Sequence, residues 1–369
     1  MKLISIGNVC AITALAFFCA CTRQMKEELN TPKEKTLAAA VSAAGPSKDG
    51  ILLRELLNSQ GPVFENFIID ATQGGEFSTQ DGSNYALSPN SLQNPDGTIT
   101  TGPVNISVKE IHTVSNMIMA DKQTNTSNAE PLVSYGEFFV RATQGAQDVS
   151  LRKDSAIQVK VKAGQVNVKE VPMWNGDSAV AASFTGTGYI NQPVTVTQLV
   201  SANKGVDWTQ SGAFALFNST TGTLNFRLDS LIKWVNCDRL GSNPNPKTTV
   251  LGYFTNFYNT ATNTSYTGEE PSMLFFKPKA QNTLIKFYNT IFTPPAGFAG
   301  FLSYQNSIPI GMQGTFLAIT SLNGAFYAEQ KTVTIAAPLP GQNYTTVSFN
   351  LQPVSGPALV ALIVSMNSK

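Results

Sequence analysis

Histidine and charged residues are what this sequence has least of. It contains one histidine, His112, and only 13% of its 369 residues are charged, about half the usual share. A single imidazole excludes most of the acid–base and triad chemistry that depends on histidine, and it excludes zinc sites built from several histidines. The low charge, together with 42% hydrophobic residues, excludes a disordered polyelectrolyte and a coiled coil.

An excess of charge of either sign is also missing. The 25 Lys and Arg residues against 24 Asp and Glu residues leave a net charge of +1. This is too small to supply the basic field that non-specific nucleic-acid binding needs. We therefore expect no nucleic-acid partner.

The N-terminus has the features of a signal peptide. Lys2 provides a positive charge, and Leu3–Phe18 is an apolar stretch that is short for a membrane span. The stretch is followed by Ala20-Cys21, which resembles the lipobox of bacterial lipoproteins, although Phe18 and Cys19 depart from the usual residues. The resemblance implies cleavage of residues 1–20 and acylation of Cys21, which anchors the chain in a membrane. An ordinary signal peptide cut nearby and an uncleaved anchor are the alternatives.

Few cysteines remain after such processing. Cys10 and Cys19 leave with the signal peptide and Cys21 is acylated, so Cys237 is alone and no intrachain disulfide is expected. Its neighbours in Trp234–Asp238 offer no base, so we expect a buried, inert thiol.

Residues 21–49 are predicted to form a tether. They are polar and rich in Ala and Ser, with Pro32 and Pro46 as helix breakers. Lys26-Glu27-Glu28 resembles the signal that sends Bacteroidetes lipoproteins to the cell surface; a solvated charge cluster is the alternative. We expect an outer-membrane lipoprotein that faces the periplasm or the cell surface.

The rest of the chain is predicted to be all-β. After a helical candidate at Gly50–Asn58, short runs of β-branched and aromatic residues are separated by Gly, Pro, Asn and Asp. The expected strands are Phe64–Ala71, Val104–Glu110, Gly136–Thr143, Ala156–Lys162, Val194–Val200, Ala213–Phe217, Thr223–Leu228, Thr249–Phe257, Met273–Lys277, Leu284–Tyr288, Gly314–Ser321, Ala325–Glu329, Thr345–Leu351 and Ala358–Ser365.

Two β-sandwich-like domains are expected from this spacing of strands. We place the first at residues 50–204 and the second at 205–369, with the boundary between Val200 and Trp208, where Ser201–Gly205 is a small polar interruption. Pro172–Asp177 is a weaker boundary candidate. Asn323-Gly324 predicts a two-residue hairpin turn, because both residues tolerate positive φ.

Three segments near the start of the first domain carry a resemblance to a known fold. Gly74–Phe77, Leu87–Leu92 and Gly102–Glu110 resemble the start of the ZU-type β-sandwich of ankyrins and netrin receptors. That resemblance implies a role in protein contacts. Self-cleavage, known in some members at a His-Phe-Ser or related step, is not implied, because Thr113 follows His112.

A likeness over most of the mature chain points to uncharacterised Bacteroidetes lipoproteins. The segments that carry it are Gly136–Ala142, Leu231–Asp238 and Ile308–Gly311. This likeness implies the fold and the location, and no activity.

Candidate catalytic and binding residues are few. A glycosidase needs two facing carboxylates, and the spacing selects no pair among Asp70, Glu110, Glu137, Asp177, Asp229 and Asp238. Asp81–Asn84 is more simply a turn than a calcium loop, so we expect no metal and no cofactor. Trp174, Trp208 and Trp234 are candidates for stacking on a ligand, with a core or domain-junction position as the alternative.

Ser155, Ser178 and Ser230 are candidate glycosylation sites. Each follows an Asp and precedes an aliphatic residue, a pattern that resembles the acceptor of Bacteroidetes O-glycosylation systems. Ordinary turn residues are the alternative. Taken together, the sequence favours a non-enzymatic binding or structural module for a protein or glycan partner. A polysaccharide-active enzyme with an Asp/Glu pair is the alternative.

Overall fold

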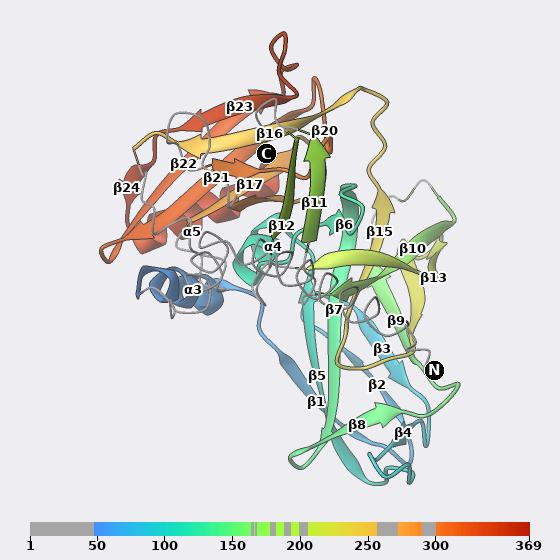
Figure 1. Cartoon of the computed structure of the whole chain (residues 1–369). Coiled ribbons are helices and arrows are strands. Elements are labelled where there is room, and N and C mark those ends of the chain that lie inside the picture. Colours follow the sequence, from blue (N-terminus) through green and yellow to red (C-terminus); the bar gives the residue numbers. More distant parts are fainter. Residues whose placement is uncertain are drawn as a thin grey trace, which may run out of the picture. The chain divides into compact units, whose positions relative to one another are not determined.

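Mostly antiparallel strands make up about half of the residues that a computed structural model describes, which are residues 48–163, 166, 168–177, 182–187, 193–198, 206–256, 272–289 and 300–369 (Figure 1). The fold is all-β, with sandwich-like domains, as predicted. Residues 1–47, which include the signal peptide, Cys21 and nearly all of the tether, lie outside the described residues, as does Ser178. Within the described residues, no helix is long and apolar enough to cross a membrane.

The first sheet has thirteen strands. In spatial order its main path is β1 (Glu65–Asp70), β5 (Pro103–Ile111), β7 (Leu132–Gln144), β15 (Trp234–Leu240), β10 (Glu170–Asp177), β13 (Asp207–Asn218), β14 (Thr223–Leu228), β9 (Ile157–Lys162), β3 (Asn84–Leu87) and β2 (Gly75–Ser78). The short strands β4 (Leu92–Gln93), β6 (Asn125–Thr126) and β8 (Gln147–Leu151) pair beside this path.

This sheet encloses its own apolar core. In β9, Ile157, Val159 and Val161 are buried and the residues between them are exposed, because successive side chains of a strand point to opposite faces. The end strands β1 and β2 meet where the rings of Phe67 and Phe77 stack with their centroids 4.3 Å apart. The sheet therefore curls round until its two ends are in contact.

The second sheet has nine strands. Its path is β20 (Ile308–Pro309), β16 (Lys247–Phe254), β19 (Gly300–Leu302), β18 (Ile285–Asn289), β17 (Ser272–Pro278), β21 (Gln313–Leu322), β22 (Ala325–Thr334) and β24 (Gln352–Val354), and β23 (Tyr344–Phe349) pairs in parallel with β16. A separate pair is formed by β11 (Ala182–Thr187) and β12 (Pro193–Gln198).

Both faces of the second sheet are covered. Along β17, Met273 and Phe275 belong to one apolar cluster, and Leu274 and Phe276 belong to another. The first cluster includes residues of the helices α3 (Lys48–Gln60), α4 (Val114–Ala120) and α5 (Gly356–Ser365) and of the 3-10 turn η3 (Met366–Ser368). This explains why β17 is a continuous apolar run rather than an alternating one.

Local signals in the sequence predict about half of these elements; β2, β3, β8, β10 and β15 are among the strands that they do not predict. The helix expected at Gly50–Asn58 is α3, and Asn323-Gly324 forms the turn of the β21–β22 hairpin with φ of 52° and 79°. The Asp49 carboxylate accepts hydrogen bonds from both backbone N–H groups of this turn, at 2.9 Å each. The start of α3 is thereby held against the hairpin.

The strand expected at Ala358–Ser365 is wrong, because this segment is the helix α5. The Ser355 hydroxyl caps it by accepting from the N–H of Ala358, and a proline lies in its first turn. Both features are helix-start signals. Leu359 and Ile363 are fully buried one turn apart, so the apolar run is a helix face and not a strand.

The expected domain boundary between Val200 and Trp208 does not coincide with a change of sheet. The strands β13, β14 and β15 follow it in the chain, yet they pair with β10, β9 and β7 of the first sheet. The change of sheet lies between Leu240 and Lys247, and the other boundary candidate is part of β10. Ser201–Gly205 themselves lie outside the described residues, and a polar interruption carries no information on which strands pair.

Candidate functional site

A buried acid lies on the inner face of β5. Val104, Ile106 and Val108 alternate into the core of the first sheet, and Glu110 continues the same row with its side chain 3% exposed. A carboxylate in such a place is costly unless hydrogen bonds satisfy it. The surroundings of Glu110 provide those bonds.

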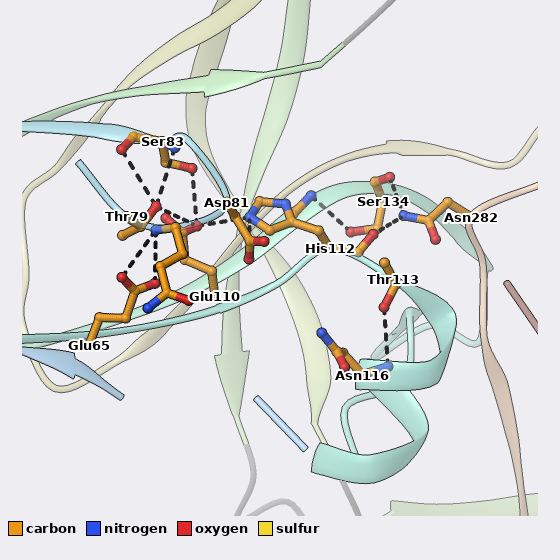
Figure 2. A network of polar contacts seen from close by, with 12 residues as sticks. Glu65, Thr79, Asp81, Ser83, Glu110, His112, Thr113, Asn116, Ser134 and Asn282 are labelled. Carbon is orange, nitrogen blue, oxygen red and sulfur yellow. Dashed lines mark hydrogen bonds and ion pairs between the residues drawn. The ribbon is translucent and has the colours of Figure 1, made fainter. Parts of the chain in front are cut away.

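The hairpin of β2 and β3 supplies three hydroxyl donors to Glu110. Thr79 and Ser83 both donate to Oε2 at 3.1 Å (Figure 2). Tyr85 donates to Oε1. Burial by itself raises the pKa of Glu110, but the hydrogen bonds from His112, Tyr85 and Ser83 outweigh it and hold the pKa below its usual value. The carboxyl group is therefore ionised at neutral pH.

The only histidine of the chain completes the network. His112 Nε2 lies 3.0 Å from Glu110 Oε2 and 3.9 Å from Asp81 Oδ2. Burial lowers the pKa of His112, but the hydrogen bond and the charge of Glu110 raise it more, so that the pKa lies above its usual value. The backbone of Tyr135 raises the pKa of His112 further.

A glycine makes room for this imidazole. Gly136 has a φ of 147°, and a Cβ atom there would lie 2.9 Å from His112 Nδ1 and 2.6 Å from the ring of Phe138. Any side chain at this position would push the imidazole away. On the other side, Asn282 donates to the carbonyl oxygen of His112 at 2.9 Å, which ties this backbone to the loop before β18 (Figure 2).

A pocket of about 300 Å³ opens beside His112. Its lining residues are Asp81, His112, Ser134, Tyr135, Val161, Lys162 and Ala163. Asp81 lies in the turn between β2 and β3, as expected from Asp81–Asn84, and its side chain is 57% exposed. The pocket therefore has an exposed carboxylate at its mouth and a half-buried imidazole inside.

Two of the three tryptophans considered for stacking on a ligand, Trp174 and Trp208, lie in the interior. Trp174 is 4% exposed and donates from Nε1 to the carbonyl oxygen of Asp238, and Trp208 is fully buried and donates to that of Gln123, each at 2.8 Å. Both pack in one cluster with Leu132 and Val206. Neither ring face is available to a ligand, which agrees with the alternative of a core position.

The acids considered for a glycosidase pair are spread over different environments. Asp70 and Asp229 are exposed at the ends of β1 and β14, and the side chain of Asp177 lies outside the described residues. Glu137 and Asp238 are fully buried on the adjacent strands β7 and β15. Burial raises the pKa of Asp238 to about 7, and burial together with the charge of Asp238 raises that of Glu137 well above its usual value. These two acids belong to the interior rather than to a cleft.

The remaining candidates lie at the surface or in the core. Ser155 is half-buried in the turn between β8 and β9, and Ser230 is half-buried beside exposed Asp229, to which its hydroxyl donates at 3.3 Å. Cys237 is a free, buried thiol, as predicted, and burial raises its pKa well above the usual value.

A row of aromatic and lysine side chains begins just before β1 and crosses β5, β7 and β15; among its rings, the sequence suggests only Trp234 as a ligand contact. We name it the aromatic row. Phe64 meets Phe139 edge to face at 5.9 Å between centroids, and Phe139 meets Trp234 at 5.4 Å. The ammonium groups of Lys109 and Lys122 lie over the rings of Phe64 and Trp234, at 4.5 and 5.3 Å. Phe64 is 44% exposed, and Phe139 and Trp234 are half-buried.

The ion pair of His112 and Glu110 predicts a specific pH dependence of stability. Because the pKa of His112 is raised on folding, its contribution is complete below about pH 6.5 and is lost as the pH rises through the folded value. Because the pKa of Glu110 is lowered, its contribution is lost as the pH falls below about 4.5. His112→Gln should therefore reduce the free energy of unfolding most between these values, by about 1–2 kcal/mol, and less at pH 8.5.

Urea unfolding of both proteins in the presence of a chelator measures this difference. Asp238 also titrates near pH 7, but it is present in both proteins and cancels in the comparison. A deficit of the same size at pH 5.5 and 8.5 would show that the imidazole does not form a charged pair.

Comparisons with protein-family models, curated proteins and solved structures find no match to this chain. The geometry of the described residues is therefore the basis for a functional proposal.

Proposed function

We propose that the chain is an outer-membrane lipoprotein, facing the periplasm or the cell surface, whose β domains bind a protein or glycan partner without catalysing a reaction. The signal-like residues 1–20, Ala20-Cys21 and the polar segment that follows support the anchor and the location. The observation that carries the binding role is the aromatic row.

The aromatic row has the composition of a recognition surface. Aromatic rings supply a large contact area with few rotatable bonds, and a ring that is partly wet retains contact area for a partner. Lys109 and Lys122 add cationic groups next to two of the rings. A surface of this kind provides both apolar contact and charge.

Of the two kinds of partner, the aromatic row favours a glycan with acidic groups. Sugar rings present C–H faces that pack on aromatic rings, and the carboxylates of acidic sugars pair with ammonium groups. Burial lowers the pKa of Lys109, and an anion placed next to that group would favour its charged form. A neutral glycan would use the rings alone.

Removing Phe64 should weaken binding to an acidic polysaccharide. Phe64→Ala deletes the most exposed ring of the aromatic row, and we expect a loss of about tenfold in affinity, since a ring at an interface contributes ~1–2 kcal/mol. Affinity electrophoresis on a panel of acidic and neutral polysaccharides measures the change. The matched control is Phe214→Ala, because Phe214 is 46% exposed on β13.

The same panel distinguishes the alternatives. Equal affinity of the Phe64 and Phe214 variants for the polysaccharide would show that the aromatic row is not part of the binding site. A protein partner would be indicated if the wild-type chain retains a protein from the native envelope, Phe64→Ala does not, and neither binds any polysaccharide. Depolymerisation of a polysaccharide by the purified protein would contradict the non-enzymatic role.

The anchor is tested separately. In the native host, Cys21→Ala should move the protein from the membrane fraction to the soluble fraction, because the acyl chains can no longer be attached. Fractionation with immunodetection measures this, and Cys237→Ala, which alters a buried thiol, is the matched control. Persistent membrane association of Cys21→Ala, or no acyl mass on the wild-type protein, would refute the anchor.

A further inference from the structure

Three potential metal ligands lie close together at His112: Asp81 and His112 line the pocket, and Glu110 lies 3.0 Å from His112. Asp81 comes from the turn between β2 and β3, and Glu110 and His112 come from β5 and the residue that follows it. One nitrogen and two carboxylate oxygens of these residues lie within 4.8 Å of one another. The set combines an imidazole with hard oxygen donors, which suits a divalent transition metal such as zinc.

The spacing of the donor atoms is compatible with one shared ion. Zinc–nitrogen and zinc–oxygen bonds of ~2.1 Å at tetrahedral angles place two ligand atoms ~3.4 Å apart. His112 Nε2 lies 3.0 Å from the Glu110 oxygen and 3.9 Å from the Asp81 oxygen, on either side of this value. Asp81 is exposed and can adjust by rotating its side chain.

Two of the three ligands are already oriented by their surroundings. Hydroxyl groups of Thr79, Ser83 and Tyr85 hold the Glu110 carboxylate. Nε2 of His112 faces Glu110, and Nδ1 lies against Gly136, where a Cβ atom would come within 2.9 Å of it. The Asn282 side chain also donates to the carbonyl oxygen of His112 at 2.9 Å, so both the ring and its backbone are held in place.

We propose that Asp81, Glu110 and His112 bind one divalent transition-metal ion of the zinc class, with a remaining coordination position open to the pocket. The ion would take the place of the proton now shared between His112 and Glu110. Lys162 also lines the pocket, and its ammonium group repels a cation there. The proposal concerns a site away from the aromatic row and does not depend on the proposed function.

The test uses the full chain, purified in detergent and freed of metal with a chelator. Because the chain contains one histidine, untagged protein gives one set of imidazole NMR signals. One equivalent of Zn²⁺ should shift these signals, and Co²⁺ should bind at the same ratio and give visible absorption bands. Asp81→Asn should weaken Zn²⁺ binding in calorimetry by about tenfold or more, and Lys162→Gln should tighten it by about two- to fivefold.

Asp96→Asn is the matched control. Asp96 is exposed in a turn, where it accepts a hydrogen bond from the N–H of Thr98, and its replacement should leave the affinity unchanged. His112→Ala should abolish binding; if that variant does not fold, the comparison of Asp81→Asn with Asp96→Asn decides. Imidazole signals that do not move at millimolar Zn²⁺, or equal affinities of the two Asp variants, would overturn the proposal.

Discussion

A buried ion pair at the end of α4 is the contact on which the packing of the helices against the second sheet depends. Lys286 of β18 is fully buried and donates to both carboxylate oxygens of Asp121, at 3.0 and 3.1 Å. Arg54 of α3 lies 3.5 Å from the same carboxylate. Burial by itself raises the pKa of Asp121, but the charges of Lys286 and Arg54 outweigh it and hold the pKa below its usual value. Loss of one partner from a buried pair costs about 3–5 kcal/mol, so this contact constrains α3, α4 and the second sheet together.

The same helix connects this constraint to the candidate metal site. The residue that caps the start of α4, Thr113, follows His112 directly, and Asp121 ends the helix in the left-handed conformation. Asn282 and Thr283, just before β18, hydrogen-bond the carbonyl oxygens of His112 and Leu132. The histidine is therefore held from the first sheet through Glu110 and from the second sheet through its own backbone. Such support on both sides favours a preformed site over one that orders on binding.

Local patterns in the sequence predict about half of the strands, and long-range contacts explain what those patterns do not predict. The alternation of buried and exposed residues in β9 and the Asn323-Gly324 turn are local patterns, and the structure confirms both. The uninterrupted apolar run of α5, by contrast, fits either a strand or a helix face. Glu110 and His112 are two residues apart, which places both on one face of an extended chain. That spacing is a signal for part of the site. Asp81, Thr79 and Ser83 reach Glu110 only through the folding back of the β2–β3 hairpin, and the burial of Trp174 and Trp208 depends on partners distant in sequence.

The tryptophan of the aromatic row is more exposed to solvent than the other two tryptophans. Trp174 and Trp208 are buried in the interior, whereas Trp234 is half-buried in the aromatic row. The most direct test of binding at the aromatic row is the quenching of tryptophan fluorescence by acrylamide, with and without a polysaccharide that the protein binds. If the aromatic row binds the polysaccharide, the polysaccharide should protect the tryptophan fluorescence of the wild-type protein from quenching. It should give no such protection in Trp234→Phe. Equal protection of the two proteins, or binding without any protection, would contradict binding at the aromatic row.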